Sequence, residues 1–355
     1  RDPGVRRDDG DVRRDDVTPV LTARNVSITY EVNPPVEAVR EVSLTLNRGE
    51  ILGLAGESGC GKTTFAYGIN RLLKAPAVMT AGEVTFHDAD GTDVDVVAMP
   101  AEALRRYRWS KVSMVFQGSM NSLNPVLTVR TQLNDVFTTH RRGMSRRARN
   151  ERAAELLSLV GVDPNRLSAY PHELSGGMRQ RVMIAMALAL EPQVMIMDEP
   201  TTALDVLVQR GIIRQLMRLR ERLGFAVIFI THDLPLLIEI SDRIAIMRAG
   251  RIVEQGTAEQ IYRTPEHQYT KQLLSSFPSL TGARGGFVRG AGSGGTTSPE
   301  ASAVVPAASP VVLAAASVIP AAPSVIPADA GISAAGTGIP GQARDDGFPA
   351  RLEEE

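Results

Sequence analysis

GESGCGKT, residues 56–63, lies between the apolar run Ile51–Ala55 and residues 64–73, which have helical character. The short apolar run predicts a buried strand, so the order along the chain is strand, glycine-rich loop and helix. In that order the spacing G-x-x-x-x-G-K-T is typical of a loop that binds phosphate. Glycines permit positive φ angles, so main-chain N–H groups and the positive end of the helix converge on one anion.

Two side chains of the loop supply charge and metal chemistry. Lys62 brings a positive charge to the β and γ phosphates of a nucleoside triphosphate, and the hydroxyl of Thr63 can bind Mg²⁺. We therefore predict a site for such a nucleotide with Mg²⁺. The residues assigned to the nucleotide here are Gly56, Glu57, Ser58, Gly59, Cys60, Gly61, Lys62, Thr63 and Thr64.

The amino-acid composition limits which classes of protein the chain can belong to. The 355 residues are 43% hydrophobic and 22% charged, as in a globular protein with one large domain and appendages, or with two domains. A formal net charge of -1 gives no argument for a nucleic-acid partner or an acidic membrane surface. Cys60 is the single cysteine, which excludes an intrachain disulfide and a cysteine-rich metal site within one chain and favours a reducing, cytoplasmic setting.

Hydrophobic periodicity predicts three structural parts. Alternating patterns near 26–30, 42–46, 84–86 and 94–97 predict a small antiparallel layer. Strands alternating with helices favour a parallel sheet, and helical periodicity between 128 and 190 predicts a helical lobe inserted at about 118–190. The buried strands after the loop are predicted at 111–117, 194–197, 225–230 and 244–247, with a helix over 205–222.

The two ends of the chain differ from the middle. Residues 1–19 repeat RRDD and offer almost nothing apolar to bury, so we predict that they are disordered. Residues 283–355 are rich in glycine and repeat SVIP, which predicts a low-complexity, disordered tail. Prolines interrupt its uncharged stretch 301–328, so a membrane-spanning helix is not expected there.

Polar side chains follow three of the predicted strands. Asp198 and Glu199 end one of them; Asp198 is placed to hold Mg²⁺ through water, and Glu199 to orient and deprotonate an attacking water. His232 follows the strand 225–230 and could reach a γ-phosphate. Gln117 ends the strand 111–117 and offers an amide oxygen to Mg²⁺ or to the attacking water. These residues predict a hydrolytic site.

LSGGMRQR, residues 174–181, predicts a second anion site. Ser175 can cap a helix whose free N–H groups at Gly176 and Gly177 face an anion. Because the first loop already occupies the triphosphate of its own nucleotide, this second site suggests that two chains enclose each nucleotide.

In combination these motifs resemble the ATPase subunit of an ATP-binding cassette transporter, and in particular the dipeptide and oligopeptide importer branch. The resemblance covers residues 21–280. The marks of the branch are Asn121–Pro125, Tyr170–Leu174 and His267–Leu274. It implies an α/β fold: a P-loop NTPase cassette with a RecA-like parallel-sheet core, an antiparallel β subdomain and an inserted helical subdomain.

The resemblance also assigns residues and boundaries. Tyr30 matches the aromatic residue that stacks on adenine, residues 174–180 the family signature that includes Gln180, and Asp205 the motif Ala203-Leu204-Asp205. It implies an ATPase domain over 20–260 and a peptide-importer type of extension over 261–282. ATP and Mg²⁺ are the implied cofactors, with Glu199, His232 and Gln117 as catalytic residues and Thr63, Gln117 and Asp198 at the metal.

The implied function is ATP hydrolysis by a dimer that drives uptake of di- or oligopeptides. The implied partners are transmembrane permease subunits, a second ATPase subunit, identical or paralogous, and indirectly an extracytoplasmic solute-binding protein. The protein would sit peripherally on the cytoplasmic face of the inner membrane. An importer of nickel, an oligosaccharide or glutathione stays open, as does a cassette ATPase acting on nucleic acid or ribosomes, which the arginine run 141–152 would support; we expect no nucleic-acid partner.

Overall fold

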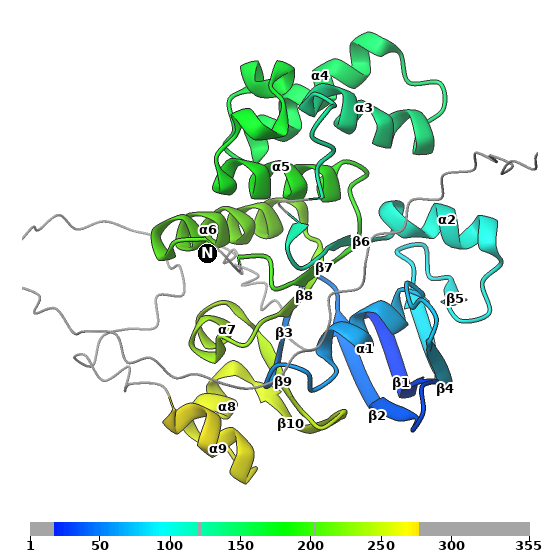
Figure 1. Cartoon of the computed structure of the whole chain (residues 1–355), viewed down its shortest axis with the longest axis vertical. Helices are drawn as coiled ribbons and strands as arrows, with labels where there is room; N and C mark the ends of the chain where they lie inside the picture. The colour runs from blue at the N-terminus through cyan, green and yellow to red at the C-terminus, as the bar shows by residue number, and fades with distance from the viewer. Residues whose placement is uncertain (1–17, 120–121, 202–203, 277–355) are drawn as a thin grey trace, which may run out of the picture. The chain divides into compact units, whose positions relative to one another are not determined.

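The computed structural model describes residues 18–119, 122–201 and 204–276 (Figure 1). Predictions for residues 1–17 and for the tail after residue 276 lie outside the described residues, as do those for Asn121 and Ala203.

A six-stranded sheet in the order β10-β9-β3-β8-β7-β6 holds the apolar runs. Each of the strands β3, β7 and β8 is buried along its whole length, because helices cover one face of the sheet, and the helix after the glycine loop together with an antiparallel sheet covers the other. The pairs from β9 to β6 are parallel, and β10 pairs antiparallel with β9 at the edge. The strands are β3 (Ile51–Ala55), β6 (Val112–Val115), β7 (Val194–Asp198), β8 (Ala226–Ile230), β9 (Arg243–Arg248) and β10 (Arg251–Thr257).

Helices connect these strands, as the alternating pattern predicted. α1 follows the glycine loop, α6 leads from β7 to β8, and α7 leads from β8 to β9. In the described part of the chain, no helix combines the length and apolar character that a bilayer crossing requires. Their bounds are α1 (Lys62–Ile69), α6 (Val206–Leu223), α7 (Leu234–Ile240), α8 (Ala258–Arg263) and α9 (Gln268–Ser275).

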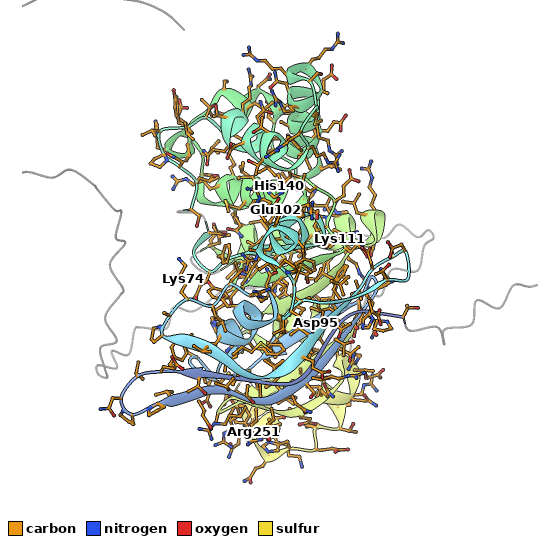
Figure 2. All side chains as sticks on the ribbon, turned by 90° about the vertical axis from the view of Figure 1, so that its right-hand side faces the viewer. Lys74, Asp95, Glu102, Lys111, His140 and Arg251 are labelled. Atoms are coloured by element: carbon orange, nitrogen blue, oxygen red, sulfur yellow. The ribbon has the colours of Figure 1, made fainter. Side chains whose placement is uncertain are left out.

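A second, antiparallel sheet has the order β2-β1-β4-β5 and packs through its buried face against α1. The approach is close, because a Cβ added to Gly68 of α1 would lie 2.4 Å from Cδ1 of Ile28. In Figure 2 this sheet and Asp95 lie below the helices that carry Glu102 and His140. The elements are β1 (Pro19–Tyr30), β2 (Val36–Asn47), β4 (Ala77–His87), β5 (Asp93–Asp95) and the helix α2 (Ala101–Ser110).

The described residues of the predicted helical lobe, between β6 and β7, form three α-helices and the two 3₁₀ turns η2 and η3, drawn at the top of Figure 1. Hydroxyl groups cap the α-helices: Thr128, Ser145 and Ser175 each accept a hydrogen bond from an N–H group in the first turn. The bounds are α3 (Val129–His140), α4 (Arg146–Leu159), η2 (Pro164–Ser168), η3 (Pro171–Glu173) and α5 (Gly176–Leu188). The α/β prediction with its parallel core, antiparallel sheet and helical insertion is confirmed; the domain boundaries stay predictions.

Two predicted strands were too long. The run 111–117 is a strand only over Val112–Val115, so Gln117 lies in a turn that Gly118, with φ +66°, helps to form. The run 94–97 ends at Asp95, because the carboxylate of Asp95 accepts hydrogen bonds from the N–H groups of Val97 and Ala98. Local side-chain bonding to the backbone ends the ladder there.

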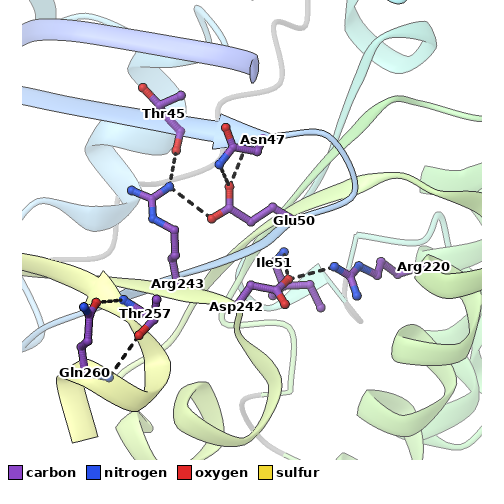
Figure 3. A network of polar contacts seen from close by, with 9 residues as sticks. All are labelled: Thr45, Asn47, Glu50, Ile51, Arg220, Asp242, Arg243, Thr257 and Gln260. Atoms are coloured by element: carbon purple, nitrogen blue, oxygen red, sulfur yellow. Dashed lines mark hydrogen bonds and ion pairs between the residues drawn. The ribbon is translucent and has the colours of Figure 1, made fainter. Parts of the chain in front are cut away.

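A partly buried polar network contacts the start of β3 (Figure 3). The side chain of Glu50 is 6% exposed, accepts hydrogen bonds from the N–H and the amide of Asn47, and forms an ion pair with Arg243 at 3.2 Å. The neighbouring Asp242 accepts hydrogen bonds from the N–H of Ile51 and from Arg220 at 2.8 Å. The network ties β9 and α6 to the strand that leads into the glycine loop.

Replacement of Arg243 by Met should lower the free energy of unfolding by about 3 kcal/mol, because it leaves the buried Glu50 carboxylate without its cation. Urea unfolding monitored by circular dichroism measures the loss. Glu50→Gln in the same chain should restore part of it, since the amide keeps the contacts with Asn47 and carries no charge. A loss below about 0.5 kcal/mol in the single variant would contradict the role given to the ion pair.

Candidate functional site

The glycine loop passes between β3 and α1 with its backbone against neighbouring chain segments. Gly56, Gly59 and Gly61 have φ angles of 150°, 79° and 107°. A Cβ at Gly56 would lie 2.1 Å from the carbonyl oxygen of Met247, and one at Gly61 would lie 2.3 Å from that of Ala38. Only glycine combines these φ angles with such close approach, so the sequence spacing is a requirement of the backbone path.

Lys62, the first residue of α1, is buried and turns its ammonium back over the loop. Its Nζ donates to the carbonyl oxygens of Gly56 at 2.7 Å and Glu57 at 2.8 Å, and lies 3.6 Å from Sγ of Cys60. The ammonium, carried by the first residue of α1, therefore lies against the main chain of the loop. A cation at the start of a helix favours an anion, so phosphate binding by this loop stays a prediction.

Asp198 and Thr63 come together across the parallel sheet and the loop. Thr63 Oγ1 donates to Oδ1 of Asp198 at 3.1 Å, and Asp198, at the end of β7, is fully buried. Within the described ranges, Oδ2 of Asp198 has no hydrogen-bond partner. A buried carboxylate oxygen with no partner, beside a hydroxyl, fits a hard cation such as Mg²⁺, which takes oxygen ligands and few of them from protein.

Burial raises the pKa of Asp198, and the nearby carboxylate of Glu199 adds to the rise, whereas the hydrogen bond from Thr63 and the charge of Lys62 oppose it. The net direction is upward. A cation beside Asp198 would favour its charged form and lower this pKa again.

Glu199 and His232 meet at the same edge of the sheet. Nδ1 of His232 lies 3.1 Å from Oε1 of Glu199. Glu199 has a φ of +44°, which is uncommon for a residue with a side chain, and its N–H donates to the carbonyl of Ile230 at 2.9 Å. The side chain of Glu199 is 16% exposed and that of His232 64% exposed, so the pair is open to solvent.

Two further predicted residues flank this group. Tyr30, near the end of β1, places its hydroxyl 3.2 Å from Oγ1 of Thr64, so its ring lies beside the first turn of α1. Gln117 lies two residues beyond β6, the strand that pairs with β7, and is exposed. The structure therefore brings Tyr30 to the first turn of α1 and leaves Gln117 in the turn that leads into the helical lobe.

Ser175 and Asp205 lie at the starts of two packed helices. Oγ of Ser175 accepts from the N–H of Met178 at α5, and the carboxylate of Asp205 accepts from the N–H of Val208 at α6. A Cβ at Gly177 would lie 2.6 Å from Cγ1 of Val208, so the two helices approach through this glycine. Both capping residues are exposed, and Gly176 is half-buried.

Gln180, assigned to the nucleotide with the signature, points into the protein. Its side chain is buried, and its Oε1 accepts a hydrogen bond from Oγ of Ser119 at 3.1 Å. This hydrogen bond links α5 to Ser119 at the start of the helical lobe. Its position in the motif gave no signal of this inward direction.

Sequence reasoning missed Tyr269 of α9 as part of the site. Its phenol oxygen accepts a hydrogen bond from the N–H of Glu57, in the glycine loop, at 3.1 Å. The two residues are 212 positions apart, so no local pattern could have paired them. The only available signal was the motif 267–274, which pointed to a family and gave no contact.

Comparison with known proteins gives consistent results. Residues 39–202 match the family described as ABC transporter, and residues 253–300 match the oligopeptide/dipeptide transporter C-terminal region. A putative peptide import ATP-binding protein of Brucella melitensis is 43% identical over 266 residues, which are 74% of this chain and 78% of that protein. The dipeptide transport ATP-binding protein of Haemophilus influenzae is 43% identical over 264 residues, 74% of this chain and 78% of that protein.

Among solved structures, a dimeric ATP-binding cassette in a post-hydrolysis state, bound to ADP and Pi, is similar with a TM-score of 0.59 and 30% identity. The match covers 67% of this chain and 98% of that chain.

Replacement of Gly56 by Ala should lower the free energy of unfolding by at least about 3 kcal/mol, because backbone strain and the contact with Met247 add together. Gly91→Ala is the matched control: its φ is +86°, but an added Cβ meets nothing within 4 Å, so a loss of about 1–2 kcal/mol is expected. Denaturant unfolding of both variants measures the difference. If both variants lose the same free energy of unfolding, the close contact between residue 56 and Met247 does not contribute to the loss.

Proposed function

The chain belongs to the ATP-binding cassette transporter family and is an ATPase of that family, and from this premise we propose that it hydrolyses MgATP as a dimer to power uptake of di- and oligopeptides through membrane permease subunits. The observation that carries the proposal is the meeting of the glycine loop, Asp198 and Glu199 at one edge of the parallel sheet. The match of residues 253–300 to the peptide transporter region directs the proposal to peptides.

In this proposal the glycine loop and Lys62 bind the β and γ phosphates, and Tyr30 lies where adenine would stack. Lys62 already stands over the loop, and Tyr30 is beside Thr64 at the start of α1. Thr63 and Asp198 would hold Mg²⁺, with Gln117 added when its turn moves toward the nucleotide. Bound there, Mg²⁺ neutralises charge on the phosphates.

In this proposal Glu199 is the residue that activates water for hydrolysis. Its carboxylate orients the attacking water and accepts a proton from it, while the bond of 3.1 Å to His232 fixes the carboxylate's direction. His232 is open to solvent, so its other ring nitrogen could contact the γ-phosphate. The strained φ of Glu199 supports a functional role, because such strain is concentrated at active sites.

The second anion site is proposed to act across a dimer. Ser175, Gly176 and Gly177 present the N-terminus of α5 at the surface, with Asp205 beside them at the start of α6. A partner chain, identical or paralogous, would place its bound nucleotide there. The solved structure of a dimeric cassette supports this arrangement by similarity of fold.

Binding of nucleic acid has less support than transport. In the arginine run 141–152, Arg147 pairs with Glu151 at 2.8 Å, and Arg152 pairs with Glu155 at 3.0 Å and Glu191 at 2.6 Å. Ion pairs of this kind partly neutralise the run. We propose instead that the protein lies peripherally on the cytoplasmic face of the inner membrane, on permease subunits that receive peptides from a solute-binding protein.

Glu199→Gln should reduce ATP hydrolysis by at least about 100-fold while ATP binding is kept, because the amide preserves shape and hydrogen bonding but cannot accept the proton. An ATP-dependent dimer should then accumulate in gel filtration. Adding Ser175→Arg to this variant should abolish the dimer and leave ATP binding, since a bulky cation fills the second anion site. Turnover at the wild-type rate by Glu199→Gln would remove Glu199 from the mechanism.

Peptide import is tested in cells. Deletion of the gene should abolish uptake of a radiolabelled dipeptide, and a plasmid with the wild-type gene should restore it, whereas one with Glu199→Gln should not. Uptake of labelled nickel and glutathione in the same strains separates the alternative solutes. If peptide uptake is unchanged and nickel or glutathione uptake is lost, the ATPase assignment stands, but peptides are not the transported solute.

A further inference from the structure

The C-terminal helix α9 contacts the glycine loop through one side chain. Tyr269 is 2% exposed, and its phenol oxygen accepts the N–H of Glu57 at 3.1 Å. Glu57 is the second residue of the loop, directly after Gly56. A hydrogen bond to the main chain constrains the peptide plane that precedes Glu57, because that plane is rigid.

The phenol of Tyr269 is itself held from the other side. The guanidinium of Arg248, at the end of β9, lies 4.7 Å from the centre of its ring. Burial raises the pKa of Tyr269, which favours the neutral phenol. Arg248 follows Met247, whose carbonyl oxygen faces Gly56, so the same strand end touches both the loop and the tyrosine.

The helix α9 has its own anchor to the sheet. The carboxylate of Glu254, in β10, accepts hydrogen bonds from the N–H groups of Glu266 at 2.7 Å and His267 at 3.1 Å. Burial alone would raise the pKa of Glu254, but the nearby side chain of Thr270 and these two bonds outweigh it and hold that pKa below its ordinary value. His267 caps α9 by accepting the N–H of Tyr269 at 3.1 Å. These bonds fix the start of α9, and with it the position of Tyr269.

The orientation of the 56–57 peptide matters to Lys62. The carbonyl oxygens of Gly56 and Glu57 are the two acceptors that hold the Lys62 ammonium over the loop. If the peptide before Glu57 rotated, the carbonyl of Gly56 would turn away from Nζ. The tyrosine and the lysine thus restrain the same peptide from opposite ends.

We infer that Tyr269 is a positioning residue for nucleotide binding: by holding the N–H of Glu57, it fixes the glycine loop in the shape that directs Lys62 toward the phosphates. Through it the C-terminal region, residues 253–276 of the described chain, acts on nucleotide affinity. The inference rests on the proposed function, because it requires that the loop binds ATP.

The test is Tyr269→Phe in the full chain, which removes the hydroxyl and keeps the ring against Arg248. Loss of one hydrogen bond should raise the Kd for a fluorescent ATP analogue and the KM for ATP about three- to tenfold, with kcat changed less than twofold. Hydrogen–deuterium exchange of the peptide that contains Glu57 should become faster without nucleotide. The melting temperature should stay within about 3 °C of the wild type, since packing is kept.

Tyr170→Phe is the matched control, because it removes the phenol hydroxyl from an exposed ring that stacks on His172 in the helical lobe. It should leave the Kd, the KM and the exchange rate unchanged. Tyr269→Leu, which removes the ring as well, should reproduce the rise in Kd and lower the melting temperature.

The outcomes separate the inference from the proposed function. Unchanged Kd, KM and exchange in Tyr269→Phe would overturn the inference and leave Tyr269 as a packing residue. A wild-type protein that fails to bind the ATP analogue would instead overturn the proposed function. In that case the rate of hydrogen–deuterium exchange at Glu57, compared between Tyr269→Phe and the wild type, decides whether Tyr269 holds the loop.

Discussion

Main-chain pairing of β3, β8 and β7 places the chemical groups of the site. In the register of the sheet, Asp198 lies opposite Ile230, and Ile230 lies opposite Leu54. The residues that follow each of these positions therefore leave the sheet at the same edge: Glu199, His232 and the glycine loop. A shift of one strand by one residue would separate Thr63 from Asp198 and turn every buried side chain of that strand to the opposite face.

A second constraint is that glycine is needed wherever two elements pack too closely for a side chain between them. Gly56 brings the loop against the end of β9, Gly68 brings α1 against β1, and Gly177 brings α5 against α6. The three contacts join the loop to the sheet edge, the antiparallel sheet to the core and the helical lobe to the helix after Asp205. Side chains at these positions would push apart elements whose faces are already filled to close packing.

The parts of this site that the sequence predicted are those whose geometry is local. The loop, Asp198, Glu199 and His232 each follow a buried apolar strand, and the end of such a strand fixes where the next side chain lies. Gln180 could not be placed in this way, because its inward direction depends on Ser119, 61 residues earlier in the chain. Tyr269 depends on the path of β9, β10 and α8, which no periodicity encodes, and Gln117 on a turn that shortened its strand.

The hydrogen bonds of Lys62 to the carbonyls of Gly56 and Glu57 have a consequence for the speed and cost of binding. A flexible loop would have to lose conformational entropy when its ligand arrived, at about 1–2 kcal/mol for each ordered residue. Here hydrogen bonds already hold the ammonium of Lys62 and the main chain of the loop together, so the entropy of ordering the loop is lost on folding. A loop ordered in this way is preorganised, so a ligand that binds it does not have to meet that entropic cost.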